Sequence, residues 1–360
     1  MNRRMFLMSS MAAFIAPRLQ TVSRRVSTIL GTGVPGRAAD HESAATARLD
    51  EPFGIVIGPD DALWFCEYGN HRVMRFDMRS KTVTLIAGDG QGAYRGDGGP
   101  ATEASLNRPH EIRFDRAGNL YVAERDNHIV RKIDLRAKRI STLAGTGEAG
   151  FSGDGGPAEK AQLRQPHSIA FDPDGNLLIC DIGNHRIRRV NMKTSQIDTF
   201  AGTGEGVATP DGAPLKGTPL NGPRSIDIAP DGTLYLVLRQ GNSVLGLDPK
   251  TQRFKRIAGT GQTGYGGDGG PARDAIFNGP KGITYAPDNS LYIADTENHV
   301  IRRVDLNDGR ISTVLGTGQR GDGPEGKPLE CKLSRPHGVF SHRKMLYVGD
   351  SEAYRIRVLI

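Results

Sequence analysis

Three histidines that each follow a proline have the residue type and spacing expected of a chemical site. The dipeptides are Pro109-His110, Pro166-His167 and Pro336-His337, and equivalent prolines stand at positions 52, 223 and 280. Successive prolines are 57, 57, 57, 57 and 56 residues apart. The residues that follow them are Phe53, His110, His167, Arg224, Lys281 and His337. Because imidazoles bind zinc and basic side chains bind anions, this position predicts a metal site or an anion site.

A second repeated position carries carboxylates. It lies thirteen or fourteen residues after the first and is occupied by Glu67, Glu124, Asp181, Leu238, Asp295 and Asp350. Carboxylate oxygens are ligands for calcium, which makes Glu67, Glu124 and Asp181 candidate metal ligands. The structural alternative is that each acid caps the turn after its strand by accepting backbone N–H groups.

The repeat itself indicates the elements that must position these residues. The unit from Pro166 to Gly204 contains short alternating apolar runs separated by turn residues, which predicts four strands. Six units predict an all-β fold, a six-bladed β-propeller with little helix. The segment RVSTILGTG, residues 25–33, matches the end of a unit, and the unit after Pro336 lacks that strand. We therefore expect the N-terminal strand to close the last blade and residues 23–360 to form one domain.

This topology predicts that the two repeated positions meet. The first strand of a propeller blade lines the central channel, and the antiparallel second strand returns to the mouth where the first began. The first residue of one strand and the last residue of the next therefore share a mouth. We expect that mouth to collect imidazoles, cations and carboxylates.

Two other repeated motifs are interpreted as scaffold. Asn-His recurs in the turn before the third strand, as in Asn184-His185, where asparagine suits a left-handed turn and histidine can pack against the next blade. Loops that begin at Tyr94, Phe151 and Tyr265 share the sequence Gly-Asp-Gly-Gly-Pro. They lack the Lys-Ser/Thr of a phosphate-binding loop, so turn chemistry explains them.

The motifs GNLYVAERDNHIVRKID, residues 118–134, and GNLLICDIGNHRIRRVN, residues 175–191, resemble those of the NHL-repeat proteins. The resemblance implies a six-bladed propeller, but the family includes sensors, scaffolds and enzymes. In one enzyme branch, the peptidyl-α-hydroxyglycine α-amidating lyases, histidines of Pro-His motifs bind a catalytic zinc. By resemblance, His110, His167 and His337 are candidate zinc ligands, although they stand on the second, third and sixth units and not on alternate ones. Related lactonase-type hydrolases hold calcium through carboxylates.

The fourth unit departs most from the repeat. It has Leu238-Arg239-Gln240 where the other units have an acid and a turn that leads to Asn-His or its equivalent. Arg224 and Arg239 thus belong to a unit without an acid at that position, which favours a ligand carboxylate or phosphate there. The sequence predicts a protein that binds a small anionic molecule or a peptide at one channel mouth. The predicted binding residues are His110, His167, Arg224, Lys281, His337, Arg239 and Phe53. A zinc- or calcium-dependent lyase or lactonase-type hydrolase is the alternative.

The beginning of the chain predicts export. Arg3 and Arg4 precede an apolar run from Met5 to Ile15, which resembles a twin-arginine signal, so residues 1–22 are expected to direct the protein to the periplasm. The run is short for a membrane span, and an uncleaved anchor is the alternative.

The composition limits the classes of partner that we expect. The 360 residues have a net charge of +7, but basic and acidic residues are interleaved, so nucleic acid is not an expected partner. We expect a monomer that meets a small molecule, a peptide or an envelope protein. The odd set of three cysteines, Cys66, Cys180 and Cys331, predicts buried thiols and no disulfide framework.

Overall fold

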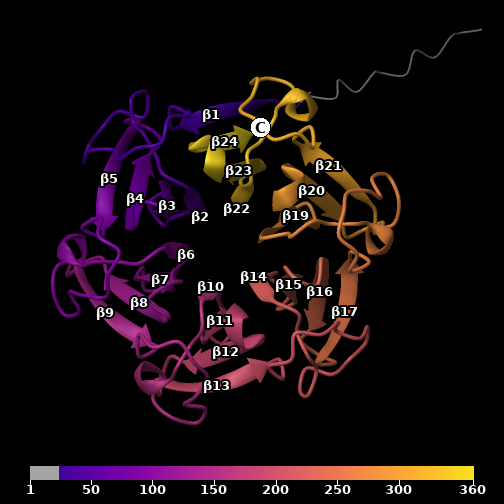
Figure 1. Ribbon diagram of the computed structural model, residues 1–360, viewed down its shortest axis with the longest axis horizontal. Helices are drawn as coiled ribbons and strands as arrows, with labels where there is room; N and C mark the ends of the chain where they lie inside the picture. Colours follow the sequence, from indigo (N-terminus) through magenta and orange to yellow (C-terminus); the bar gives the residue numbers. More distant parts are fainter. Residues whose placement is uncertain (1–23) are drawn as a thin grey trace, which may run out of the picture.

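A computed structural model describes residues 24–360 as six four-stranded antiparallel sheets arranged in a ring (Figure 1). The predicted export segment lies outside the described residues. The first blade contains β2 (Pro52–Ile57), β3 (Leu63–Glu67), β4 (Arg72–Asp77) and β5 (Thr82–Ala87). The second contains β6 (Pro109–Phe114), β7 (Leu120–Glu124), β8 (Ile129–Asp134) and β9 (Arg139–Ala144). The third contains β10 (Pro166–Phe171), β11 (Leu177–Asp181), β12 (Arg186–Asn191) and β13 (Gln196–Ala201).

The remaining blades follow the same order. The fourth contains β14 (Pro223–Ile228), β15 (Leu234–Leu238), β16 (Ser243–Asp248) and β17 (Arg253–Ala258). The fifth contains β18 (Gly282–Ala286), β19 (Ser290–Asp295), β20 (Val300–Asp305) and β21 (Ile311–Leu315). The sixth contains β22 (Pro336–His342), β23 (Met345–Asp350), β24 (Arg355–Leu359) and β1 (Val26–Leu30).

Closure of the ring occurs as the sequence predicts. β1 pairs antiparallel with β24, with Val26 opposite Leu359, and the backbones of Arg25 and Ile360 exchange two hydrogen bonds of 3.0 Å. Because the two ends of the described chain share one sheet, the sixth blade is as complete as the others. The prediction of a six-bladed propeller whose last blade is closed by the N-terminal strand is confirmed.

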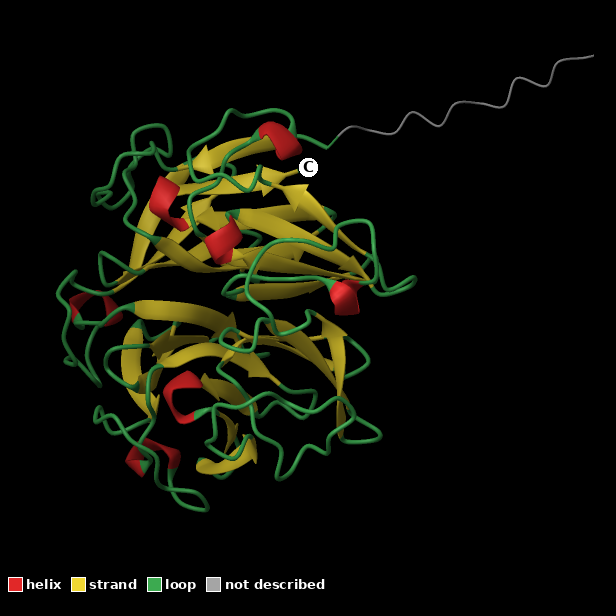
Figure 2. Ribbon diagram, turned by 45° about the vertical axis from the view of Figure 1, so that its right-hand side comes forward, coloured by secondary structure: helices red, strands yellow, loops and turns green. Residues whose placement is uncertain are grey.

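Helical structure in residues 24–360 consists of single 3-10 turns in the connections between strands (Figure 2). They are η1 (Ala101–Glu103), η2 (Ala158–Lys160), η3 (Ile182–Asn184), η4 (Ala272–Asp274), η5 (Thr296–Asn298), η6 (Pro328–Glu330) and η7 (Ser351–Ala353). Within the described residues, the model contains no helix that is long and apolar enough to cross a membrane.

The hydrophobic core lies between adjacent blades. The strands β2, β3, β6 and β7 contribute to one apolar cluster, and equivalent clusters follow around the ring. Inner strands such as β3 are buried along their whole length because both of their faces contact a neighbouring blade. The three cysteines are buried and unpaired, as predicted.

The turn that ends each blade requires glycine. In the second blade, Gly145 has a φ of 96°, and a Cβ atom there would lie 2.4 Å from the carbonyl oxygen of His128. Only glycine tolerates both the left-handed backbone and this close approach. The repeated Gly-Thr-Gly therefore lets the chain leave the outer strand and reach the inner strand of the next blade.

Candidate functional site

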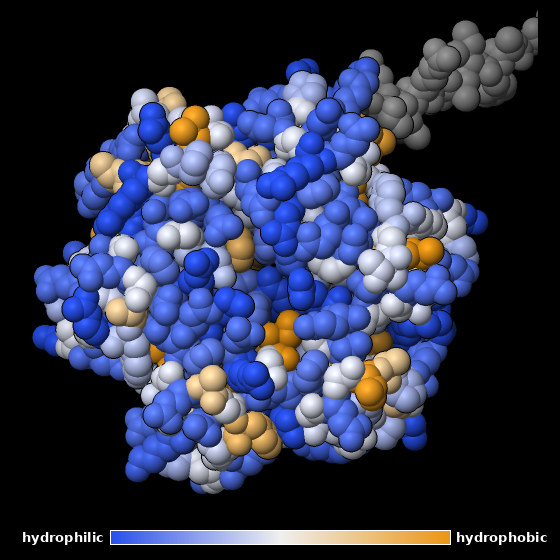
Figure 3. Space-filling view, viewed as in Figure 1, coloured by the Kyte–Doolittle hydropathy of each residue, from blue (hydrophilic) through white to orange (hydrophobic). Residues whose placement is uncertain are grey.

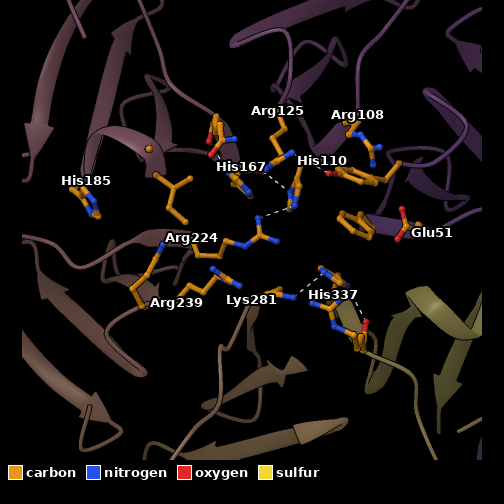
Figure 4. A pocket seen from close by; sticks show the side chains of 17 residues that line it. Glu51, Arg108, His110, Arg125, His167, His185, Arg224, Arg239, Lys281 and His337 are labelled. Carbon is orange, nitrogen blue, oxygen red and sulfur yellow. Dashed lines mark hydrogen bonds between the residues drawn. The ribbon is translucent and has the colours of Figure 1, made fainter. Parts of the chain in front are cut away.

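The six residues that follow the repeated prolines all line one cavity at the end of the central channel (Figure 4). The cavity has a volume of about 430 Å³, which is sufficient for a small ligand. These residues are Phe53, His110, His167, Arg224, Lys281 and His337. Arg239, predicted from the irregular fourth unit, also lines it. The structure thus brings together all seven predicted ligand-binding residues.

A β-bulge aims most of these side chains at the cavity. In the second blade, Pro109 is paired with Glu124 and Glu111 with Ala123, so His110 is the extra residue between them. A shift at the same place occurs in the first, third, fourth and sixth blades. Such an extra residue bends the strand and redirects its side chain. The fifth blade differs, because β18 begins at Gly282, immediately after Lys281.

Backbone carbonyls fix the tautomer of the three predicted histidines. The Nδ1 atom of His110 lies 3.0 Å from the carbonyl oxygen of His167. The Nδ1 atom of His167 lies 2.6 Å from the oxygen of Gln165, and that of His337 lies 2.8 Å from the oxygen of Arg335. A carbonyl oxygen only accepts, so each Nδ1 must carry the proton. Each Nε2 atom therefore presents a lone pair.

Two of these lone pairs are occupied by cations. Nη1 of Arg224 donates to Nε2 of His110 at 2.7 Å, and Nζ of Lys281 donates to Nε2 of His337 at 3.2 Å. Within residues 24–360, Nε2 of His167 has no hydrogen-bond partner. His167 therefore offers the cavity an acceptor that the other two histidines do not.

Burial keeps the imidazoles of His110 and His337 neutral. It lowers the pKa of His110 well below its ordinary range, and the charge of Arg224 lowers it further. The pKa of His337 is depressed in the same way by burial and by Lys281. Burial and Arg224 also lower the pKa of Lys281 to about 7, although Glu297 lies 2.8 Å from its Nζ atom and opposes the shift.

The cavity is strongly basic. Its lining includes six cations, Arg108, Arg125, Arg224, Arg239, Lys281 and Arg335, and one carboxylate, Glu51. Within the described residues, most of these cations have acidic partners: Asp126 pairs with Arg108 and Arg125, whereas Glu297 pairs with Lys281 and Arg335. Arg224 and Arg239 form no ion pair in the same part of the chain. The uncompensated positive charge is thus concentrated on the fourth blade.

Aromatic rings form one wall of the cavity. Phe53 is stacked between Tyr68, with ring centroids 4.2 Å apart, and His337, with centroids 4.0 Å apart. His110 meets Phe53 edge-on at 5.0 Å. These stacked rings give the cavity an apolar wall beside its cations.

The predicted carboxylates are not in the cavity, contrary to the expectation that they share its rim. Asp181 is fully buried and accepts hydrogen bonds from the backbone N–H of Arg164 at 2.6 Å and from Nδ2 of Asn184 at 2.7 Å. Nη1 of Arg188 lies 3.6 Å from the same carboxylate. Burial raises the pKa of Asp181 to about 6, so it is ionised at neutral pH.

Glu67 and Glu124 are also buried and bound by neighbouring groups, although Oε1 of Glu124 has no hydrogen-bond partner within the described residues. Glu67 pairs with Arg72, and Glu124 lies 3.6 Å from Arg131. Each also accepts a backbone N–H and the amide of the following asparagine. Side chains alternate along a strand, so in several blades the residue after this position, and not the residue at it, faces the cavity. In four blades these next residues are Tyr68, Arg125, Ile182 and Arg239.

The arrangement of these residues does not fit zinc or calcium. Zinc would need converging imidazole nitrogens, but Arg224 and Lys281 occupy those of His110 and His337. Calcium would need several free carboxylate oxygens, and the candidate acids are tied to arginine and backbone groups away from the cavity. Among residues 24–360, no group of three or more His, Cys, Asp or Glu side chains is placed to hold a metal ion.

The Asn-His turns join adjacent blades, as expected of a scaffold. Nδ1 of His128 accepts the backbone N–H of Gln165 in the next blade at 3.1 Å. In the fourth blade Asn242 replaces the histidine and accepts from Gly279 at 2.9 Å. The left-handed residue is the histidine, with a φ of 57° at His128, and not the asparagine as predicted. The asparagine instead donates to the buried acid.

The repeated glycine-rich loops also have a structural role. Asp154 of the second such loop accepts a hydrogen bond from Nη2 of the buried Arg188 at 2.7 Å. Asp97 and Asp268 bind Arg131 and Arg302 in the same manner. These aspartates are therefore occupied by arginine.

Sequence reasoning missed one further position that lines the cavity. It is the residue before the repeated proline, which is Glu51, Arg108, Gln165 or Arg335 in four blades. All four have left-handed backbones, with φ between 48° and 54°. The equivalent residues in the other two units are Gly222 and Gly279. These two glycines were the sequence signal of a left-handed backbone at this position of the repeat.

Hydrophilic side chains cover most of the face seen in Figure 3, and its hydrophobic patches are small and separate. This face therefore lacks the extended apolar area that marks a large hydrophobic interface.

Comparisons with known proteins agree with this architecture. The NHL repeat model matches residues 163–190 and 277–303. Over 327 residues, the chain is 28% identical to Protein SUPPRESSOR OF QUENCHING 1, chloroplastic, from Arabidopsis thaliana, covering 88% of this chain and 31% of that protein. Human NHL repeat-containing protein 2 is 26% identical over 329 residues, covering 83% of this chain and 45% of that protein. The chain thus spans less than half the length of either relative.

A solved structure of an auxiliary nutrient binding protein from Bacteroides thetaiotaomicron has the same fold. It aligns with a TM-score of 0.68 at 17% identity and covers 94% of this chain and 76% of its own. This likeness shows the fold alone. The two NHL repeat matches, the NHL repeat-containing relative and the six four-stranded blades identify the chain as a six-bladed β-propeller that contains NHL repeats.

Proposed function

We propose that this protein binds a small anionic molecule, or the anionic group of a peptide, in the cavity at the channel mouth. The observation that carries this proposal is Arg224. Its side chain is 4% exposed, and its Nε atom has no hydrogen-bond partner. Its one side-chain hydrogen bond in the described structure goes to His110, an imidazole that burial keeps neutral.

A buried guanidinium without a counter-charge is costly, and an anion bound beside it would offset that cost. Burial and the nearby charge of Arg239 lower the pKa of Arg224 well below its ordinary range, so the environment disfavours an isolated cation. Guanidinium groups bind carboxylate and phosphate through paired hydrogen bonds. Lys281 adds a third donor near the same place.

The acceptor on His167 and the aromatic wall define the rest of the binding surface. The free Nε2 atom of His167 can accept a hydrogen bond from a ligand hydroxyl or N–H group. Phe53 and Tyr68 offer ring edges to an apolar part of the ligand. We further propose, from the twin-arginine-like segment, that the protein meets this ligand after export to the periplasm.

Calorimetric titration of the full chain with phenyl phosphate, phenyl sulfate and inorganic phosphate tests the proposal. Arg224→Ala combined with Lys281→Ala should weaken binding at least about tenfold, because a hydrogen bond to a charged group contributes about 1.5–3 kcal/mol. Arg136→Ala is the matched control, since Arg136 is exposed and lies outside the cavity. Thermal melting verifies that each variant is folded. Equal affinity of the double variant and the native protein would refute the proposal.

A further inference from the structure

We propose that the ligand of this cavity carries two negative charges, held jointly by Arg224 and Arg239. The inference rests on the proposed anion-binding function and specifies the class of ligand. It follows from the pairing of charges around the cavity and from the way the fourth blade replaces its own ion pair.

Each of the other lining cations already has an acidic partner. Asp126 lies 3.2 Å from Nε of Arg108 and 2.6 Å from Nη1 of Arg125. Glu297 lies 2.8 Å from Nζ of Lys281 and 2.7 Å from Nη2 of Arg335, which also pairs with Glu352 at 2.5 Å. Within residues 24–360, the two lining cations left without an acidic partner are Arg224 and Arg239.

Acids deeper in the channel do not supply the missing charge. Glu111, the residue after His110, pairs with Arg113. Asp227 on β14 accepts the backbone N–H groups of Tyr285 at 2.7 Å and Ile228 at 3.0 Å. Within residues 24–360, neither carboxylate forms an ion pair with Arg224 or Arg239, so these two guanidinium groups remain available to a ligand.

The fourth blade holds its two arginines on adjacent strand ends. Pro223 pairs with Leu238 across β14 and β15, so Arg224 and Arg239 each follow one member of the same pair. Figure 4 shows both side chains at the cavity. Two cations at one place match two negative charges, whether these belong to one phosphate group or to two carboxylates.

The fourth blade lacks the buried acid–arginine pair of the other blades. Where other blades bury an acid and an arginine, it buries Leu238 and Leu245. Replacing a buried ion pair by apolar residues leaves no charge to satisfy. Arg239 stands at the position of Arg125 and Ile182, which line the cavity in their own blades, and within residues 24–360 it has no acidic partner.

Two pairs of probes of matched shape test this inference by calorimetry. Phenyl phosphate at about pH 7.5 is mostly a dianion, since its second pKa is about 6, whereas phenyl sulfate is a monoanion. Succinate and monomethyl succinate form the corresponding pair with two carboxylates or one. We expect at least about tenfold tighter binding of the dianion in one of the two pairs, and the pair that discriminates identifies the chemical source of the charge.

Arg239→Ala should weaken binding of that dianion about ten- to a hundredfold. The dianion and the monoanion of the pair should then bind with nearly equal affinity. Arg136→Ala, which changes the net charge equally, should leave the ratio unchanged. If monoanions bind as tightly as dianions in both pairs, the inference is overturned and anion binding itself stands. If no probe binds, both proposals are overturned.

Discussion

Replacement of Asp181 by leucine should destabilise the ring without removing any group from the cavity. Asp181 is fully buried and is bound by the backbone N–H of Arg164, the amide of Asn184 and the guanidinium of Arg188. Removing one member of a buried ion pair costs about 3–5 kcal/mol. Arg188 keeps a second partner, Asp154, at 2.7 Å, so we expect the lower end of this range.

This energy converts into a measurable change of melting temperature. At about 2.1 cal/mol/K per residue, unfolding of residues 24–360 has an entropy of about 0.7 kcal/mol/K, so 3 kcal/mol lowers the melting temperature by about 4 °C. The assay is thermal melting at about pH 8, where Asp181, whose pKa is raised to about 6 by burial, is ionised in the folded protein. Asp198→Leu is the control, because Asp198 is exposed on β13.

The fourth blade suggests how the loss can be rescued. Leu238 and Leu245 occupy the positions of the acid and the arginine there. Asp181→Leu with Arg188→Leu should therefore be less destabilised than the sum of the single variants, with a coupling of about 1–3 kcal/mol. A melting temperature of Asp181→Leu within about 1 °C of native, or strict additivity in the double variant, would refute this account of the buried acids.

Two further predictions concern the lysine of the cavity and the joints between blades. Phenyl sulfate, whose charge is constant, should bind more weakly as pH rises from about 6 to about 8, because Lys281, with its pKa lowered to about 7, loses its charge over that interval. Calorimetric titrations at several pH values measure this affinity. If the affinity of Lys281→Arg for phenyl sulfate depends on pH in the same way as that of the native protein, the prediction is wrong. His128→Leu should lower the melting temperature by about 1–4 °C because the partly buried N–H of Gln165 loses its acceptor, at a cost of about 1–3 kcal/mol. His128→Asn should melt close to native, since Asn242 makes the equivalent hydrogen bond in the fourth blade, and similar melting of the two variants would count against this role.

The repeat explains why so much of the fold is readable from sequence. A unit of constant length must place equivalent residues at equivalent points of every blade, so the alternation in one copy predicts the strands of all six. The same regularity identified the channel-lining position from Phe53 to His337. The departure of Leu238 from the repeat rule likewise directed attention to Arg239, which the structure places in the cavity.

The direction of each side chain at a strand end was not readable in the same way. The acid at Asp181 and the isoleucine after it differ by one residue, yet one is buried against Arg188 and the other lines the cavity. A bulge at His110 shifts the opposite strand end by one residue, and no sequence pattern marks it. A change of register by one residue moves a side chain to the opposite face of the sheet. The sequence alone therefore could not predict that the carboxylates point away from the cavity.

The amino-acid sequence by itself determined the number of blades, the closure of the ring by residues 26–30, and the place of the six residues after the repeated prolines at the channel mouth, because these follow from periodicity and from antiparallel connectivity. Only the tertiary structure decided which charges are paired. Ion pairs such as that of Arg335 in the sixth blade with Glu297 in the fifth join adjacent blades, and the distance between such side chains is set by the packing of the blades around one axis. The cations that remain unpaired, Arg224 and Arg239, are therefore a property of the assembled ring.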